Sequence, residues 1–139
     1  MNAVVQLNPL KRAPVKFVEA DQLGKVWPTV SKWIEAALEH GQGDESVTDV
    51  LIACARNQYG IATDGESMAC VFQYVKYPQQ SVVTLIYAGG SLDACYRAFE
   101  WAKEYFKAHG VEVLRIWGRA GWEKTLGLER IGTIMQIHL

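Results

Sequence analysis

The chain has 139 residues, of which 50% are hydrophobic, and its formal net charge is -1. This length is enough for one domain with its own core, and the near-neutral charge provides no broad field that would attract a nucleic acid or a membrane surface. No run of about 18 apolar residues is present, so the sequence predicts no membrane span. Residues 1–15 lack the basic start and long apolar stretch of a secretory signal.

The N-terminal part of the chain divides near residue 13. Pro9 and Pro14 disfavour regular structure, so residues 1–13 are predicted to be a flexible arm. Residues 14–139 are predicted to form a single domain, which begins with a strand at 15–20.

Two helices are predicted to follow this strand. The first begins after Asp21 as its N-cap and ends at Gly41, with apolar residues at helical spacing between them. A loop then leads to residues 46–58, where Ser46 or Thr48 caps a second helix with its own apolar stripe.

Residues 59–90 are predicted to form three strands. Asp64-Gly65 is typical of a hairpin turn between the first two, and a longer connection precedes the third. The third strand, residues 81–88, is apolar on both faces, so we expect it to lie centrally in a sheet.

The last part of the chain alternates between helices and strands. A long amphipathic helix is predicted from Ser91, its cap, to Gly110, followed by a buried strand at 111–117, a short helix at 120–127 and a terminal strand at 129–139. The resulting order, β-α-α-β-β-β-α-β-α-β, predicts an α/β (α+β) fold. Its mixed, mostly antiparallel sheet would have about six strands, with helices on both faces.

The three cysteines predict no metal site. Cys54, Cys70 and Cys95 lie far apart among apolar neighbours and form neither a Cys-x-x-Cys pair nor a Cys/His spacing typical of a metal centre. We expect reduced, buried thiols in a cytosolic protein.

The predicted element order is that of the GNAT (N-acetyltransferase-like) fold. The stretches "YAGG" at 87–90, "EWAKEYFKAHGVEVLRIWGRAGWEKTL" at 100–126 and "ERIGTIMQIHL" at 129–139 resemble small GNAT-like proteins of tailed bacteriophages. The resemblance covers residues 15–139 by element order and 87–132 by motif. It implies a phage protein in the host cytoplasm or packaged in the virion.

The resemblance also implies acetyl-CoA as cofactor. In active members the fourth and fifth strands splay apart, the pantetheine arm pairs with the fourth strand, and the diphosphate contacts backbone N–H groups where the next helix starts. Helix N-termini offer such donors, and glycines allow a phosphate to approach the backbone. The alternative is that the Gly89-Gly90 pair only makes a tight turn. The implied cofactor-binding residues are Ile86, Tyr87, Ala88, Gly89, Gly90, Ser91 and Leu92.

Two features depart from the family pattern. Active members usually carry a basic residue in the loop before the long helix, whereas this chain has Asp93 there and no Lys or Arg in residues 88–96. A carboxylate at this place weakens the binding of a polyanion. Many active members also place a tyrosine in the late helix to protonate the leaving thiolate, where this chain has Trp122 and Thr125.

The catalytic base varies within this fold, and the sequence offers several candidates. Glu66, Asp64 and Tyr87 lie near the implied cleft. Arg119 follows the predicted fifth strand, at the kind of strand end where open α/β sheets place ligands. The structural alternative is that Arg119 caps the preceding helix or pairs with Glu123.

Two functions from different classes follow. The first is an acyl-CoA-dependent N-acyltransferase with a degenerate cofactor loop, whose acceptor is an amine of a small molecule or a protein. The second is a non-catalytic phage protein with the GNAT fold, which acts as a virion component or binds a host factor.

Overall fold

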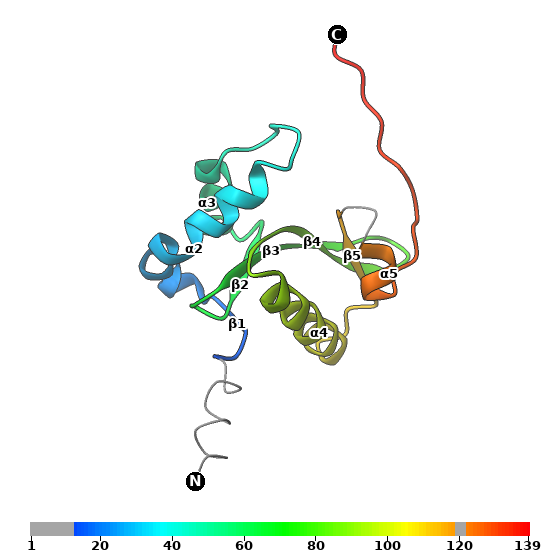
Figure 1. Cartoon of the computed structure of the whole chain (residues 1–139). Coiled ribbons are helices and arrows are strands. Elements are labelled where there is room, and N and C mark those ends of the chain that lie inside the picture. The colour runs from blue at the N-terminus through cyan, green and yellow to red at the C-terminus, as the bar shows by residue number, and fades with distance from the viewer. Residues whose placement is uncertain (1–12, 119–121) are drawn as a thin grey trace.

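The computed structural model of the chain describes residues 13–118 and 122–139 (Figure 1). The predicted arm therefore lies almost entirely outside the described residues. No helix in the described ranges combines the length and the apolarity that crossing a bilayer requires. The elements, in chain order, are β1 (Lys16–Phe17), the 3₁₀ turn η2 (Ala20–Gln22), α2 (Leu23–Leu38), α3 (Val47–Ala55), β2 (Gly60–Thr63), β3 (Met68–Lys76), β4 (Ser81–Gly90), α4 (Leu92–Ala108), β5 (Val113–Ile116) and α5 (Trp122–Leu126).

The strands form one mixed sheet. Its order in the described residues is β1-β2-β3-β4-β5; the first three pairings are antiparallel, and only β4 and β5 pair in parallel. The predicted mixed, mostly antiparallel sheet is confirmed, with five strands where about six were expected. As predicted, β4 lies inside the sheet, and residues 81–86 are buried.

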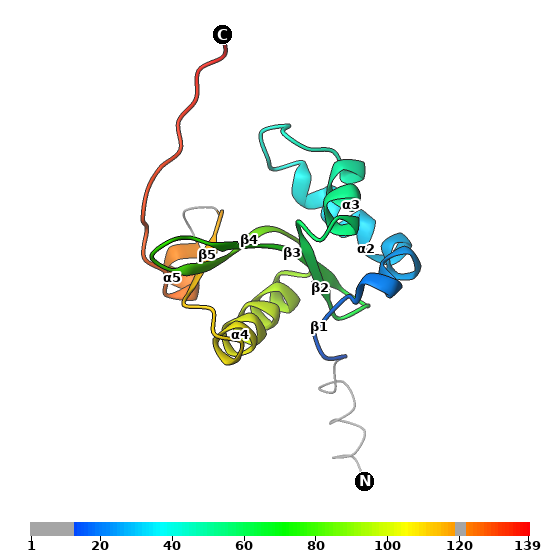
Figure 2. The same ribbon diagram turned by 180° about the vertical axis from the view of Figure 1, so that it is seen from behind.

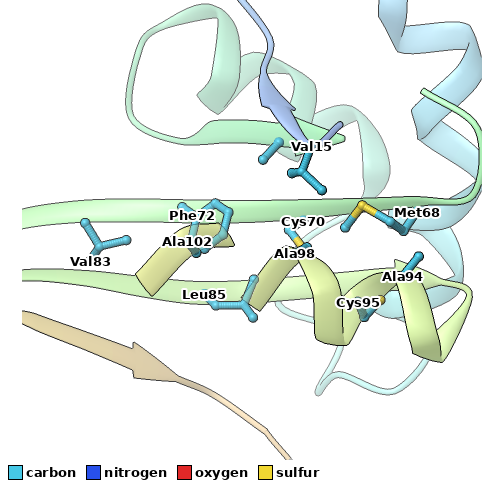
Figure 3. Packing of buried hydrophobic residues seen from close by; sticks show 11 residues of the cluster. Val15, Met68, Cys70, Phe72, Val83, Leu85, Ala94, Cys95, Ala98 and Ala102 are labelled. Atoms are coloured by element: carbon cyan, nitrogen blue, oxygen red, sulfur yellow. The ribbon is translucent and has the colours of Figure 1, made fainter. Parts of the chain in front are cut away.

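Helices cover both faces of this sheet. Successive side chains of a strand point to opposite faces, so one strand can pack against helices on both sides. Ala69 and Val71 of β3 pack with residues of α2 and α3, while Met68, Cys70 and Phe72 pack with residues of α4. Figures 1 and 2 show α2 and α3 on one side of the sheet and α4 on the other. The close-up in Figure 3 shows the α4 side of the core.

Most predicted helix ends are confirmed. Ser46 forms a capping box with Asp49 at the start of α3, and the Ser91 hydroxyl accepts a hydrogen bond from the Ala94 N–H at 3.3 Å. Gly110 follows α4 with φ of +80°, a backbone conformation that favours glycine.

The first helix starts differently from the prediction. Asp21 lies inside η2, and α2 begins two residues later, with Gln22 at the N-cap position and no side-chain cap. The predicted strand at 15–20 is reduced to β1, because the chain turns into η2 at Ala20.

The predicted terminal strand at 129–139 is wrong for the described structure. This segment leaves α5 and runs outward with no strand neighbour among the described residues (Figures 1 and 2). Because no strand of the described residues pairs on its outer side, β5 is an edge of the sheet. Its residues are therefore only half-buried, although the sequence predicted a buried strand.

Candidate functional site

A β-bulge at Ile86 separates β4 from β5. Leu85 pairs with Phe72 and Tyr87 with Val71, so Ile86 is the extra residue on β4. The parallel pairing with β5 ends at Leu85, whose carbonyl also accepts the Trp117 N–H at 3.2 Å. Bulges bend a strand and are frequent beside active sites. From Ile86 onward, β4 therefore has β3 on one side and no described strand on the other.

A cavity of about 600 Å³ opens where the two strands diverge. Its inner wall is β4 at residues 86–88, and Trp117, Gly118 and Trp122 form the β5 side. The opposite wall is the end of α2 with the following loop, and residues 134–136 of the C-terminal segment complete the lining. The structure thus brings Ile86, Tyr87 and Ala88 together in one cavity; the other four implied cofactor residues, 89–92, do not line it.

Two close backbone contacts account for Gly89 and Gly90. A Cβ on Gly89 would lie 1.9 Å from the carbonyl oxygen of Trp33, and a Cβ on Gly90 would lie 2.2 Å from that of Ser67. Gly90 also has φ of +106°, where a side chain is strained. The glycine pair therefore allows α2 and the β2–β3 hairpin to approach β4 closely.

Two backbone donors at the start of α4 form hydrogen bonds within the protein. The Ser91 N–H donates to the Ser67 carbonyl at 2.9 Å, and the Ala94 N–H donates to the Ser91 hydroxyl. Asp93 lies 3.7 Å from the Nε of Arg97, a basic residue that sequence analysis missed. These contacts oppose the binding of a diphosphate, because it would compete for the two engaged N–H groups and face the Asp93 carboxylate.

A carboxylate with two phenol partners lies beside the cavity. Tyr59 donates its hydroxyl proton to Glu45 at 3.0 Å, and Tyr87 donates to the same carboxylate. Glu45 and Tyr87 both line the 600 Å³ cavity, and Glu45 with Tyr59 lines a second cavity of about 370 Å³. Glu45 therefore lies between two open spaces and can be reached from the cleft.

This arrangement argues against Tyr87 as a base. Burial, followed by the hydrogen bond and the charge of Glu45, raises the pKa of Tyr87 well above its usual value, and the same causes raise the pKa of Tyr59 to about 12. Both phenols therefore stay protonated near neutral pH and act as donors that hold the Glu45 carboxylate. Glu45 could not be identified from the sequence because its partners are 14 and 42 residues away along the chain.

The remaining candidates lie elsewhere. Glu66 is exposed at the β2–β3 hairpin and does not line the cavity. Arg119 lies outside the described residues. Glu123, its proposed partner, accepts a hydrogen bond from the Nε of Arg130 at 2.6 Å. In α5, Trp122 lines the cavity and Thr125 is exposed.

Asp64 closes the hairpin and is not positioned as a base. Its side chain is 2% exposed, and its carboxylate accepts hydrogen bonds from the backbone of Glu66, Ser67 and Met68 and from the Ser67 hydroxyl. Burial acts to raise the pKa of Asp64, but these hydrogen bonds together outweigh burial and hold the pKa below its usual value. Arg97 lies 3.6 Å from the same carboxylate.

Asp64→Asn is therefore expected to lower the free energy of unfolding by about 1–3 kcal/mol at neutral pH, because an amide cannot accept all of these hydrogen bonds. A lowered pKa means that the stabilisation is present above the unfolded-state pKa, about 3.9, and is lost as the pH falls through the folded-state value. Urea unfolding at pH 7, 5 and 3 measures this. A gap between wild type and variant that stays constant over this range would contradict the role of the ionised carboxylate.

The three cysteines are buried and form no disulfide, as predicted. Burial, with a smaller effect of the Glu45 charge, raises the pKa of Cys54 to about 11. A thiol with so high a pKa is a poor nucleophile near neutral pH, so none of the site chemistry is assigned to Cys54.

Among the comparisons with known proteins, the solved structures indicate the fold. No protein-family model and no curated protein sequence matches the chain. Solved structures match 91% of it. One is an aminoglycoside acetyltransferase from an uncultured soil metagenomic sample in complex with sisomicin (8% identity, 95% of that chain, TM-score 0.65). Another is the aminoglycoside N-acetyltransferase AAC(6')-Iy in complex with CoA (11% identity, 93% of that chain, TM-score 0.62).

A third structure is described differently, as a transcriptional regulator from Bacillus halodurans C-125 (10% identity, 91% of this chain, 99% of that chain, TM-score 0.58). At such low identities the likeness concerns the arrangement of the chain and not its activity. The matches span 91% of the chain with TM-scores of 0.58 to 0.65, and the chain has the GNAT acetyltransferase fold.

Proposed function

We propose that the chain is an acyl-thioester-dependent N-acetyltransferase that acts on a cationic amine. The observation that carries the proposal is the cavity at the divergence of β4 and β5, which joins an unpaired strand edge to the Glu45 carboxylate. In the described part of the chain no strand pairs with this side of β4 beyond Leu85, and an extended pantetheine amide chain offers hydrogen-bond partners to such a strand edge.

The donor would lie along residues 86–88. Acetyl-CoA supplies an acetyl group activated as a thioester. Backbone N–H groups on the outer edge of β4, near the Ile86 bulge, are in the position to stabilise the negative charge that develops on the acetyl oxygen. The pantetheine part of the cofactor fits this wall. The start of α4 does not fit the diphosphate equally well, since Ser91 and Asp93 are already engaged there.

The acceptor would be held by Glu45. An ammonium group would donate a charge-assisted hydrogen bond to this carboxylate, which two tyrosines keep in place. Asp44 lines the same cavity and adds negative charge to this wall. The two aminoglycoside acetyltransferases among the structural matches support a polycationic amine as the acceptor class.

In the reaction, the amine must first lose a proton, and Glu45, which lines the cavity, would accept it. The nitrogen then forms the amide bond to the acetyl carbon while the carbon–sulfur bond breaks. The nitrogen loses its second proton as the amide forms, the departing thiolate takes up one proton and leaves as the thiol, and the proton first taken by Glu45 passes to solvent, so that atoms and charge balance.

Donor binding tests the proposal. Isothermal titration should show that acetyl-CoA and S-acetylpantetheine bind with dissociation constants within about tenfold of each other, because the α4 start adds little affinity for the diphosphate. A far larger preference for acetyl-CoA would show that the α4 start does hold the diphosphate. Failure to bind either thioester would overturn the proposed function.

One observation favours a second candidate. Both glycines before α4 are explained by packing, and Asp93 stands where a phosphate would lie. These features also suit a protein that keeps the fold without its cofactor, such as a virion component or a binder of a host factor. The absence of binding to both thioesters would favour this second function.

A further inference from the structure

Arg115, on β5, is a charged residue without a counter-ion. Its side chain is half-buried and makes no hydrogen bond or ion pair within residues 13–118 and 122–139. The Nε atom is buried without a partner. Glu112, the nearest acidic residue along the chain, accepts the Ser81 N–H at 3.2 Å instead. Because a half-buried cation without a compensating charge is unfavourable, an anion from outside the chain would be stabilised beside Arg115.

Tyr77 contacts the guanidinium group of Arg115. The Arg115 Cζ lies 5.8 Å from the centre of the Tyr77 ring, which is a cation–π contact. Such a contact orients the guanidinium but supplies no oxygen acceptor for its N–H donors. Because Arg115 is only half-buried, an incoming ligand can reach these donors. The arrangement suits a planar anion such as a carboxylate, which can accept two parallel hydrogen bonds from a guanidinium.

Two neutral polar residues extend from Arg115 across the sheet. Thr84 of β4 pairs with Arg115, and Gln73 of β3 pairs with Thr84, so the three side chains form a row on one face. Their neighbours in the chain pack on the α4 side, so the row lies on the other face, where α2 and α3 cover the end of the sheet away from β5 (Figures 1 and 2). Gln73 lines the 370 Å³ cavity, and Trp117, two residues beyond Arg115, lines the 600 Å³ cavity. The row therefore begins at one cavity that Glu45 lines and ends beside the other.

We propose that Arg115 binds an anionic group of the acceptor, and that the acceptor is therefore an amine that also carries a carboxylate. This inference rests on the proposed function for the amine, which Glu45 would hold. Thr84, beside Arg115, lies three residues before Tyr87, the partner of Glu45, and three residues span about 10 Å along a strand. The amine and the carboxylate of the acceptor should therefore be separated by several bonds.

The charges on the two sides of this site select among cationic amines. Asp44 and Glu45 make one wall of the cavity negative, whereas Arg115 brings a positive charge to the β5 side. Arg115 would repel a second ammonium group and attract a carboxylate. An amine with a carboxylate at its far end should therefore bind more tightly than a diamine of the same length.

Calorimetric titration with matched ligands tests the anion site without any thioester. The amino acid 6-aminohexanoate should bind about tenfold or more tightly than hexylamine, which lacks the carboxylate, and more tightly than the diamine 1,6-diaminohexane. In Arg115→Gln the advantage of the amino acid over hexylamine should fall to within about twofold. Lys76→Gln is the matched control, because Lys76 is an exposed cation at the end of β3, and it should keep the wild-type preference.

A fourth ligand separates the anion site from the proposed function. Hexanoate, the carboxylate without the amine, should bind equally to the wild type and to Glu45→Gln and should lose its binding in Arg115→Gln. This result would support the anion site even if neither thioester bound and the acetyltransferase proposal failed. A wild type that binds the amino acid no better than hexylamine, tighter binding of the diamine, or an Arg115→Gln variant that weakens all four ligands equally would each overturn the proposal.

Discussion

Gly89→Ala should lower the free energy of unfolding by about 3 kcal/mol or more, the largest loss expected from so small a change in this chain. The added Cβ would lie 1.9 Å from the carbonyl oxygen of Trp33 and 2.7 Å from its carbonyl carbon. Both atoms belong to the backbone of α2, so the overlap can be relieved only if the helix moves away from β4. Urea unfolding followed by tryptophan fluorescence measures the loss.

Gly24→Ala is the matched control for this prediction. Gly24 lies in α2, and a Cβ added there would have nothing within 4 Å, so the substitution should be neutral or should stabilise by up to about 1 kcal/mol. Equal stability of the two variants would contradict the packing role of Gly89. A substitution at Gly90 would likewise disturb the packing against Ser67. If such a variant no longer bound a ligand, the loss could come from this disturbed packing, so it would not show that a phosphate binds at Gly90.

Glu45→Gln should lower kcat/KM for a cationic amine by roughly 10- to 100-fold, through loss of a charge-assisted hydrogen bond. The amide oxygen of glutamine can still accept the hydroxyl protons of Tyr59 and Tyr87, so the fold should persist. Release of the thiol from acetyl-CoA, with sisomicin as a trial acceptor, measures the change, and calorimetric binding of sisomicin measures it independently of turnover.

Glu66→Gln serves as the comparison for this variant. Glu66 is an exposed carboxylate outside the cavity, so its removal should leave both measurements at the wild-type level. If Glu66→Gln were impaired and Glu45→Gln were not, the acceptor would lie at the hairpin and the assignment of Glu45 would be wrong.

The helix caps, the hairpin turn and the buried face of α4 could be predicted from the sequence, because each depends on residues that are close together along the chain. Ser46 and Ser91 cap helices because their hydroxyls reach backbone donors three residues away, and Asp64-Gly65 turns the chain within one hairpin. The apolar stripe of α4 predicted its buried face for the same reason. Such features need no knowledge of distant parts of the chain.

Features that depend on distant contacts could not be predicted in this way. The period-two pattern of 129–139 indicates a strand but does not say which edge it joins. Glu45 stands in a loop rich in glycine, and nothing nearby indicates that two tyrosines from β4 and the start of β2 will reach it. The sequence left a turn or a phosphate contact open for the Gly89-Gly90 pair, whereas the structure shows close approach to Trp33 and Ser67.

The single parallel pairing of the sheet has a consequence for the order of folding. Strands β2, β3 and β4 follow one another through short connections, so their antiparallel pairs close small loops. The β4–β5 pair is joined only through the whole of α4 and spans four residues of β5. We therefore expect the antiparallel strands to associate first and β5 to dock last. The cleft wall that carries Trp117 is then also the part of the sheet that can open at the lowest free energy while the rest stays folded.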